Sequence, residues 1–193
     1  MNHYVVFDLD DTLGAFPTMS RDMFESRRRN PHLQENARFN MLMEETPYLR
    51  PQIVGILRFL QQTKQVRPLT VVLYTNNGST AWVNHIVQYL NRMVGAPVFD
   101  KVIDATRGTL EKSIANLFAC LKVKKPKDLR LFFVDDQWHE NMLGDTIKYY
   151  SHDHLFYDGQ TMYYHIPPYA TPNAFEYAPT EKLGQLLVHF FNQ

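Results

Sequence analysis

Residues 5–12 read Val5-Val6-Phe7-Asp8-Leu9-Asp10-Asp11-Thr12, an apolar run that ends in acids. A short run of this kind, apolar without alternation, is typical of a β-strand that is buried on both faces. Two similar runs, 69–74 and 131–134, also end in small polar or acidic residues, and helical patterns lie between the runs. The sequence therefore predicts an α/β fold with a parallel sheet covered by helices on both faces.

Amphipathic helices are predicted between the apolar runs, because apolar residues recur there about every 3.6 positions. The predicted helices cover residues 51–63, 80–94 and 114–121, and a last helix is expected after Thr180. Ser79 or Thr80 is a suitable N-cap for the second of these helices. Strands separated by helices in this way predict a three-layer, Rossmann-like arrangement in which ligands bind beyond the carboxyl ends of the strands.

The whole chain, 1–193, is expected to form a single domain with two additions to the alternating pattern. Short strands are predicted within 98–105 and 147–150. The first addition, residues 14–48, is polar and helix-prone, and we expect a small helical lid there, inserted after the first strand. The second, residues 151–193, is expected to form a C-terminal hairpin that turns at Asp158-Gly159, followed by the last helix.

Six apolar side chains of the predicted lid are expected to pack it: Met19, Met23, Phe24, Phe39, Leu42 and Met43.

Composition places the protein among soluble globular proteins. Apolar residues make up 45% of the chain and charged residues 21%, and the formal net charge is zero. No overall charge draws the chain to nucleic acid or to a membrane. The single cysteine, Cys120, allows no disulfide within the chain. We expect an intracellular protein, cytoplasmic or alternatively nuclear, with no signal peptide and no membrane span.

The acids after the first strand have the chemistry of a phosphoryl-transfer site. Asp8 and Asp10 are two positions apart, so both side chains point to one face at the end of the strand. Neighbouring carboxylates repel, which favours one ionised nucleophile and one protonated general acid. A carboxylate that attacks a phosphate dianion needs a cation, and Mg²⁺ suits oxygen ligands. Asp135 and Asp136, after another buried strand, complete this cation site; alternatively they cap a helix near Gln137.

Three further residues are candidates for binding the phosphoryl group. Thr75 ends the apolar run 69–74, and its hydroxyl and the backbone near Asn76 offer hydrogen-bond donors ahead of a helix. The alternative is a plain turn between strand and helix. Lys112 precedes the third helix and offers an ammonium to neutralise charge. The alternative is a solvated lysine, in which case Lys101 or Arg107 would supply the cation.

These four segments resemble the four signatures of the haloacid dehalogenase (HAD) superfamily, in the same order. Asp8-Leu9-Asp10-Asp11-Thr12 matches the first signature, Thr75 the second, Lys112 the third and Asp135-Asp136 the fourth. The resemblance covers about residues 4–150.

By this resemblance, Asp8 attacks phosphorus and Asp10 is the acid and base. Thr75 and Lys112 hold the phosphoryl group, and Thr12 braces the turn. The resemblance also implies Mg²⁺ bound by Asp8, Asp135, Asp136 and the Asp10 carbonyl. The presence of Asp10 favours phosphatase chemistry over dehalogenase chemistry.

A second resemblance concerns the segment before and within the first predicted helix. Tyr48-Leu49-Arg50-Pro51, leading into Phe59-Leu60, is similar to the small phosphatases that act on the C-terminal domain of RNA polymerase II. Those enzymes usually carry Asp-Asn where this chain has Asp135-Asp136, and residues 14–48 do not match their insert.

The leading prediction of function is therefore a Mg²⁺-dependent phosphomonoester hydrolase, acting on a phosphorylated protein or small molecule. One alternative is a nucleotide phosphatase or a polynucleotide 3′-phosphatase. The other is a catalytically idle phosphate-binding or scaffold protein with the same fold. No membrane partner is expected.

Other features of the sequence are expected to be structural or solvated. Two basic runs, Arg27-Arg28-Arg29 and Lys122 to Lys127, are typical of a solvated face, with contact to a phosphorylated polymer as the alternative. His152-Asp153-His154 has the residue types of a metal pair but no other obvious ligands nearby. Cys120 is expected in the core, and the tyrosines of 149–177 are expected to attach the tail to the domain.

Overall fold

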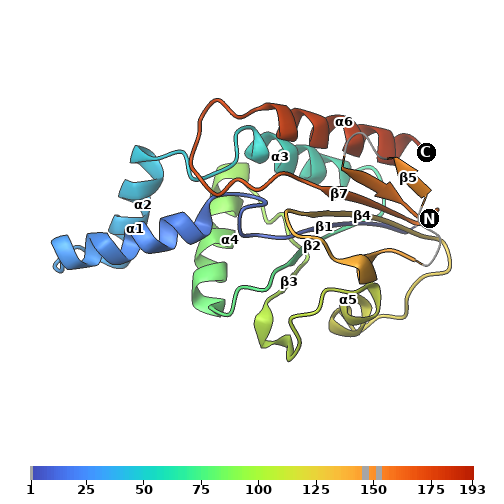
Figure 1. Ribbon diagram of the computed structural model, residues 1–193, viewed down its shortest axis with the longest axis horizontal. Helices are drawn as coiled ribbons and strands as arrows, with labels where there is room; N and C mark the ends of the chain where they lie inside the picture. Colours follow the sequence, from blue (N-terminus) through green and yellow to red (C-terminus); the bar gives the residue numbers. More distant parts are fainter. Residues whose placement is uncertain (1, 145–147, 151–153) are drawn as a thin grey trace.

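The computed structural model describes residues 2–144, 148–150 and 154–193 (Figure 1). Its centre is a seven-stranded sheet with the strand order β3-β2-β1-β4-β7-β6-β5. The strands are β1 (Asn2–Phe7), β2 (Leu69–Tyr74), β3 (Lys101–Ile103), β4 (Leu129–Asp135), β5 (Lys148–Tyr150), β6 (Leu155–Tyr157) and β7 (Thr161–His165). The helices are α1 (Phe16–Arg29), α2 (Glu35–Glu45), α3 (Ile53–Thr63), α4 (Thr80–Val94), α5 (Ile114–Leu121) and α6 (Ala178–Asn192). Two 3₁₀ turns, at Ala105–Arg107 and Glu140–Met142, complete the described elements.

Neighbouring strands pair in parallel from β3 through β2, β1 and β4 to β7. The remaining two pairings, β7 with β6 and β6 with β5, are antiparallel. The predicted hairpin is confirmed, with Gly159 at a φ of +99° in the turn between β6 and β7. The prediction of a purely parallel sheet was incomplete. The hairpin extends the sheet beyond β4, because its second strand, β7, pairs with β4. Within the predicted strand 147–150, β5 begins at Lys148, and Ile147 lies outside the described residues.

Side chains alternate between two cores, one on each face of the sheet. In β1, Val5 and Phe7 enter the core that packs against α3, α4 and α6, whereas Val6 enters the core that packs against α5. The same alternation holds along β2 and β4. This is the two-residue period of a strand with helices on both faces, so the predicted three-layer α/β fold is confirmed. Figure 1 shows α3 and α6 on one side of the sheet and α5 on the other.

The helices follow their predicted ranges with small differences at the ends. Ser79 caps α4, its side chain accepting from the backbone N–H of Trp82 at 3.4 Å. The last helix, α6, begins at Ala178, earlier than predicted, with a proline in its first turn. Proline there needs no N–H acceptor, so it extends the helix start. No helix in the described part of the chain combines the length and apolarity needed to cross a membrane.

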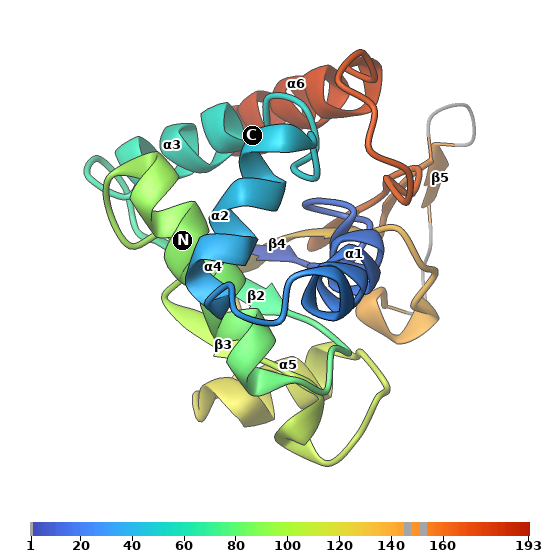
Figure 2. The same ribbon diagram turned by 90° about the vertical axis from the view of Figure 1, so that its left-hand side faces the viewer.

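The helical insert after β1 is confirmed as the pair α1 and α2. It projects from the end of the sheet where the parallel strands terminate (Figures 1 and 2). Met19, Met23 and Phe39 are buried as predicted, but Phe24 is 56% exposed. Phe24 follows Met23 by one position, and the 100° turn between them carries it away from the packed face.

Candidate active site

The carboxyl ends of β1 and β4 bring two acids together. Phe7 pairs with Val134 in the sheet, and the backbone N–H of Asp8 donates to the Val134 carbonyl at 2.9 Å. The next residues, Asp8 and Asp135, therefore lie beside each other, and both are buried. Adjacent parallel strands end at one edge, so two segments more than a hundred residues apart meet by register alone.

Lys112 bridges these two carboxylates. Its Nζ lies 2.5 Å from Oδ1 of Asp8 and 2.6 Å from Oδ2 of Asp135, and its side chain is 2% exposed. The residue arrives from the loop ahead of α5, where Ser113 caps the helix by accepting from the Asn116 N–H. The alternative prediction of a solvated lysine was therefore wrong. Burial lowers the pKa of Lys112, but the carboxylates of Asp8 and Asp135 raise it by more. The pKa is therefore raised overall, and the ammonium form is retained.

Asp8, Asp135 and Asp136 form a group of acids able to hold a metal ion. One carboxylate oxygen from each lies within 4.8 Å of the others. The alternative that Asp135 and Asp136 cap a helix near Gln137 was wrong, because the nearest helical turn begins at Glu140. The Asp135 side chain instead accepts from the Gln137 N–H at 2.9 Å and holds the chain in a turn.

The charges in this group are not balanced by protein atoms. Burial raises the pKa of Asp8 to about 7; Lys112 opposes the rise and Asp135 adds to it. Burial acts in the same direction on Asp135, but contacts with His139 and Lys112 lower its pKa overall. Burial and the neighbouring Asp135 raise the pKa of Asp136. Three carboxylates share one ammonium, and a hard divalent cation would supply the missing positive charge.

Asp10 stands beside this group with one oxygen held and one free. Its Oδ2 accepts from Nδ2 of Asn77 at 2.9 Å, whereas its buried Oδ1 has no hydrogen-bond partner among the described residues. Burial raises the pKa of Asp10, and the Asn77 contact only partly opposes the rise. A protonated carboxyl with a free oxygen is the form required of a general acid. The prediction missed Asn77, whose only sequence signal is its place two residues after Thr75.

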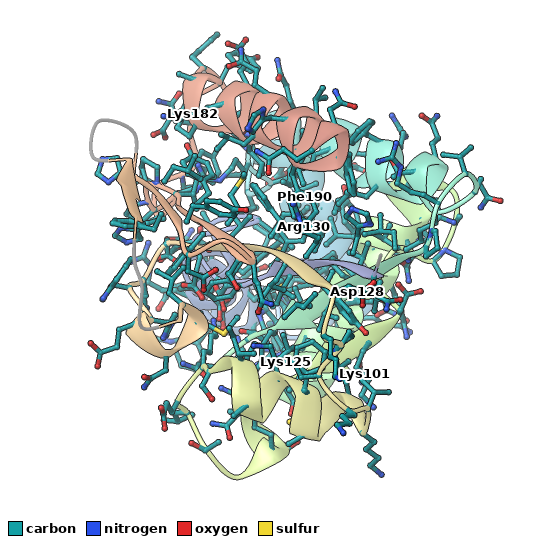
Figure 3. The ribbon with its side chains drawn as sticks, turned by 90° about the vertical axis from the view of Figure 1, so that its right-hand side faces the viewer. Lys101, Lys125, Asp128, Arg130, Lys182 and Phe190 are labelled. Atoms are coloured by element: carbon teal, nitrogen blue, oxygen red, sulfur yellow. The ribbon has the colours of Figure 1, made fainter. Side chains whose placement is uncertain are left out.

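The loop after β2 brings Thr75 and Asn76 to the same edge. Thr75 is buried, and its hydroxyl accepts from the Asn77 N–H at 3.1 Å. Arg107 holds this loop by donating to the Thr75 carbonyl at 2.6 Å and to the Asn76 side chain. Arg107 thus braces the loop and is not the cation that meets Asp8. Lys101, the other reserve candidate, begins β3, at the amino end of that strand, and lies on the face shown in Figure 3.

A cavity of about 250 Å³ joins most of these side chains. It is lined by Asp8, Asp10, Asp11, Pro17, Thr75, Asn76, Lys112, Asp135 and Gln137. Of the residues predicted for the site, only Thr12 and Asp136 are absent from this lining, and they bond each other behind it. Pro17 comes from α1, so the helical insert forms part of the wall.

The pair His152-Asp153 lies outside the described residues.

Thr12 ties the turn after β1 to the turn after β4. Its hydroxyl donates to Oδ1 of Asp136 and accepts from the Asp136 N–H, both at 3.0 Å. We expect Thr12→Val to lower the free energy of unfolding by about 1.5–3 kcal/mol, because two hydrogen bonds, one to a carboxylate, are lost. Urea unfolding measures the change. Thr12→Ser keeps the hydroxyl and is the control; equal stability of the Val and Ser variants would contradict the assignment.

Arg50 is a further residue of the site whose role the sequence did not reveal. It is buried, and its guanidinium donates to the backbone carbonyls of Asp11, Thr12 and Pro167 at 2.6–2.7 Å. Asp11 has a φ of +57°, an uncommon conformation outside glycine, at the point where the chain turns after Asp10. Arg50 therefore holds the turn that carries Asp10 and Thr12.

Comparison with known proteins finds similarity among solved structures. No family model matches the chain, and no curated protein matches it. Among solved structures, the chain is similar to YfnB from Bacillus subtilis, assigned as a HAD-hydrolase and crystallised bound to magnesium. The two share 12% sequence identity with a TM-score of 0.39, over 69% of this chain and 79% of that one.

Proposed function

We propose that this chain is a magnesium-dependent phosphomonoester hydrolase of the HAD type, acting through an aspartyl-phosphate on Asp8. One observation carries the proposal. A buried carboxylate at a strand end contacts a buried ammonium, and a second carboxyl with a free oxygen stands two residues further on. The residues that the proposed reaction needs as nucleophile, source of positive charge and general acid all line one cavity of about 250 Å³.

The residues divide the reaction between them. An oxygen of Asp8 attacks phosphorus, and the bond from phosphorus to the leaving oxygen breaks. Asp10 gives its proton to that oxygen. Asp10 then accepts a proton from water, whose oxygen attacks phosphorus and releases phosphate and the Asp8 carboxylate. Lys112 neutralises charge throughout, and the Thr75 hydroxyl and the loop at Asn76 hold phosphoryl oxygens.

Asp8, Asp135 and Asp136 fit a bound Mg²⁺, because their carboxylates are close together, Asp8 and Asp135 are buried and Asp136 is half-buried, and the group is short of positive charge. The ion would supply electrostatic stabilisation of the phosphoryl oxygens. The Asp10 carbonyl would be a further ligand.

Hydrolysis of a generic aryl phosphate tests the proposal. The wild-type protein is expected to release phosphate with Mg²⁺ present and to stop when a chelator is added. A wild-type rate no faster than that of Asp8→Asn would contradict it. That outcome would favour an idle phosphate-binding protein with this fold.

Magnesium is also expected to stabilise the folded chain. A ligand that binds only the folded state raises the free energy of unfolding by about 1.4 kcal/mol at ten times its dissociation constant. Thermal unfolding with increasing Mg²⁺ measures this gain. Asp136→Asn is expected to reduce the gain, whereas Asp22→Asn on α1 keeps it. An unfolding midpoint that does not move with Mg²⁺ would contradict the metal site.

A further inference from the structure

A groove continues from the catalytic cavity along the helical insert. It has a volume of about 460 Å³ and shares Asp10 and Pro17 with the cavity. One wall is α1, with Ser20 and Arg27, and the other includes Ser79 and Trp82 at the start of α4. Figure 2 looks onto this end of the molecule, where α1 and α4 stand on opposite sides. A leaving group protonated by Asp10 has its exit here, and we call this the leaving-group groove.

The face of α1 toward the groove carries polar and aromatic side chains. Pro17, Ser20, Phe24 and Arg27 recur every three or four positions, which places them along one side of the helix. Phe24 lies between Ser20 and Arg27 on this side, and it is 56% exposed although the neighbouring Met23 is buried. Phe24 does not line the groove itself, but it lies about one helical turn from both Ser20 and Arg27, so its exposed ring is accessible to a ligand bound along α1.

Arg27 supplies the positive charge of the groove. Its Nε and Nη2 each lie 2.7 Å from an oxygen of Glu35 at the start of α2, and its Nη1 has no hydrogen bond among the described residues. The arginine side chain is 55% exposed and that of Glu35 is 51% exposed. The pair is exposed to solvent and screened by salt, and Nη1 of Arg27 remains accessible to a second anion.

The dimensions of the groove decide the kind of leaving group. Pro17 and Arg27 are ten residues apart on one helix, which is about 15 Å at about 1.5 Å per residue. An extended peptide covers that distance in about four to five residues. A small phosphate ester that reaches Asp10 would not reach Arg27. A polynucleotide presents a phosphate at every step and is held by several cations, whereas among the residues that line the groove only Arg27 is cationic.

We propose that the leaving-group groove binds an extended phosphopeptide with an acidic side chain three to five residues from the phosphorylated residue. Arg27 is the residue that selects it, through a carboxylate or a second phosphate, and Phe24 and Trp82 contact the peptide between the two ends. The proposal rests on the proposed phosphatase function and names its substrate class.

The test compares hydrolysis of synthetic phosphoserine peptides. One glutamate is moved through five positions on each side of the phosphoserine in an otherwise neutral sequence; glutamine replaces it in the reference peptide. We expect about tenfold higher kcat/KM for one or two neighbouring glutamate positions at a separation of three to five residues. A second phosphoserine at that position tests whether a dianion serves better than a carboxylate.

Two variants separate substrate selection from the structure of the insert. Arg27→Gln and Glu35→Gln both remove the ion pair between α1 and α2. Arg27→Gln is expected to abolish the preference for the acidic peptide, and Glu35→Gln to keep or increase it, because Arg27 is then free of its competitor. Equal loss of the preference in both variants would show a structural role and overturn the proposal.

Other outcomes are equally decisive. A wild-type protein that hydrolyses all peptides at one rate has the proposed activity but no such subsite. Faster hydrolysis of a 3′-phosphorylated oligonucleotide than of any peptide would also overturn the subsite. If the wild type hydrolyses neither peptides nor an aryl phosphate, the phosphatase function itself is wrong.

Discussion

Asp8→Asn is expected to lower the rate of phosphate release from an aryl phosphate by at least about 10³-fold. The amide nitrogen cannot attack phosphorus, and the remaining amide oxygen is a poor nucleophile. Asp10, Lys112 and Thr75 stay in place, so the loss reports the covalent step. Steady-state release of phosphate with saturating Mg²⁺ measures it.

The same substitution is not expected to unfold the protein. Burial raises the pKa of Asp8 to about 7, so at neutral pH the ionised form costs stability relative to the unfolded chain. The neutral asparagine avoids that cost and has a similar volume. Asp22→Asn is the matched control, since Asp22 accepts from the Tyr48 hydroxyl at 2.6 Å on the insert and lines neither the cavity nor the groove. A folded Asp8→Asn protein that keeps a tenth of the activity would contradict the nucleophile assignment.

Arg50→Met is expected to lower the free energy of unfolding by about 3–5 kcal/mol. Three backbone carbonyls accept from this one guanidinium, and its removal leaves them without a donor in a buried place. The turn at Asp11 also loses the contacts that hold its positive φ. Denaturant unfolding measures the effect. We expect activity to fall as well, because Asp10 lies on the released turn.

Two comparisons make this prediction specific. Arg50→Lys keeps the charge but cannot reach three separate carbonyls, so we expect an intermediate loss of stability. Arg58→Met on α3 removes an exposed arginine with a single contact, to the Met93 carbonyl, and is expected to cost about 1 kcal/mol or less. Equal effects at positions 50 and 58 would show that Arg50 does not hold the turn.

The arrangement of the strands was open to prediction because its signals are local. Apolar runs such as 69–74 and the helical spacing of 80–94 depend only on neighbouring residues. The acids and small polar residues at the ends of those runs then point to one edge, because parallel strands end together. Asp8, Thr75 and Asp135 could therefore be brought together without coordinates.

The sequence predicted that a hairpin and a helical insert would form, but not how each packs against the rest of the domain. Gly159 marks the turn between β6 and β7, yet only pairing with β4 decides that this hairpin extends the sheet. Phe24 was expected to pack and is exposed instead, because apolar character alone does not tell which side of α1 faces α2. The groove between α1 and α4 depends on that orientation.

The sequence by itself determined the order of the elements, the edge at which the polar residues gather and the chemistry that those residue types allow. Tertiary structure decided which charges are buried and what holds the loops. Lys112 is a buried side chain that bridges two carboxylates and is not solvated. Arg50 and Arg107 donate to backbone carbonyls, and because every residue has a carbonyl, no residue type in the sequence marks these partners. Hydrophobic periodicity depends only on residues that are close in the sequence, whereas a hydrogen bond to a distant carbonyl exists only once the chain has folded.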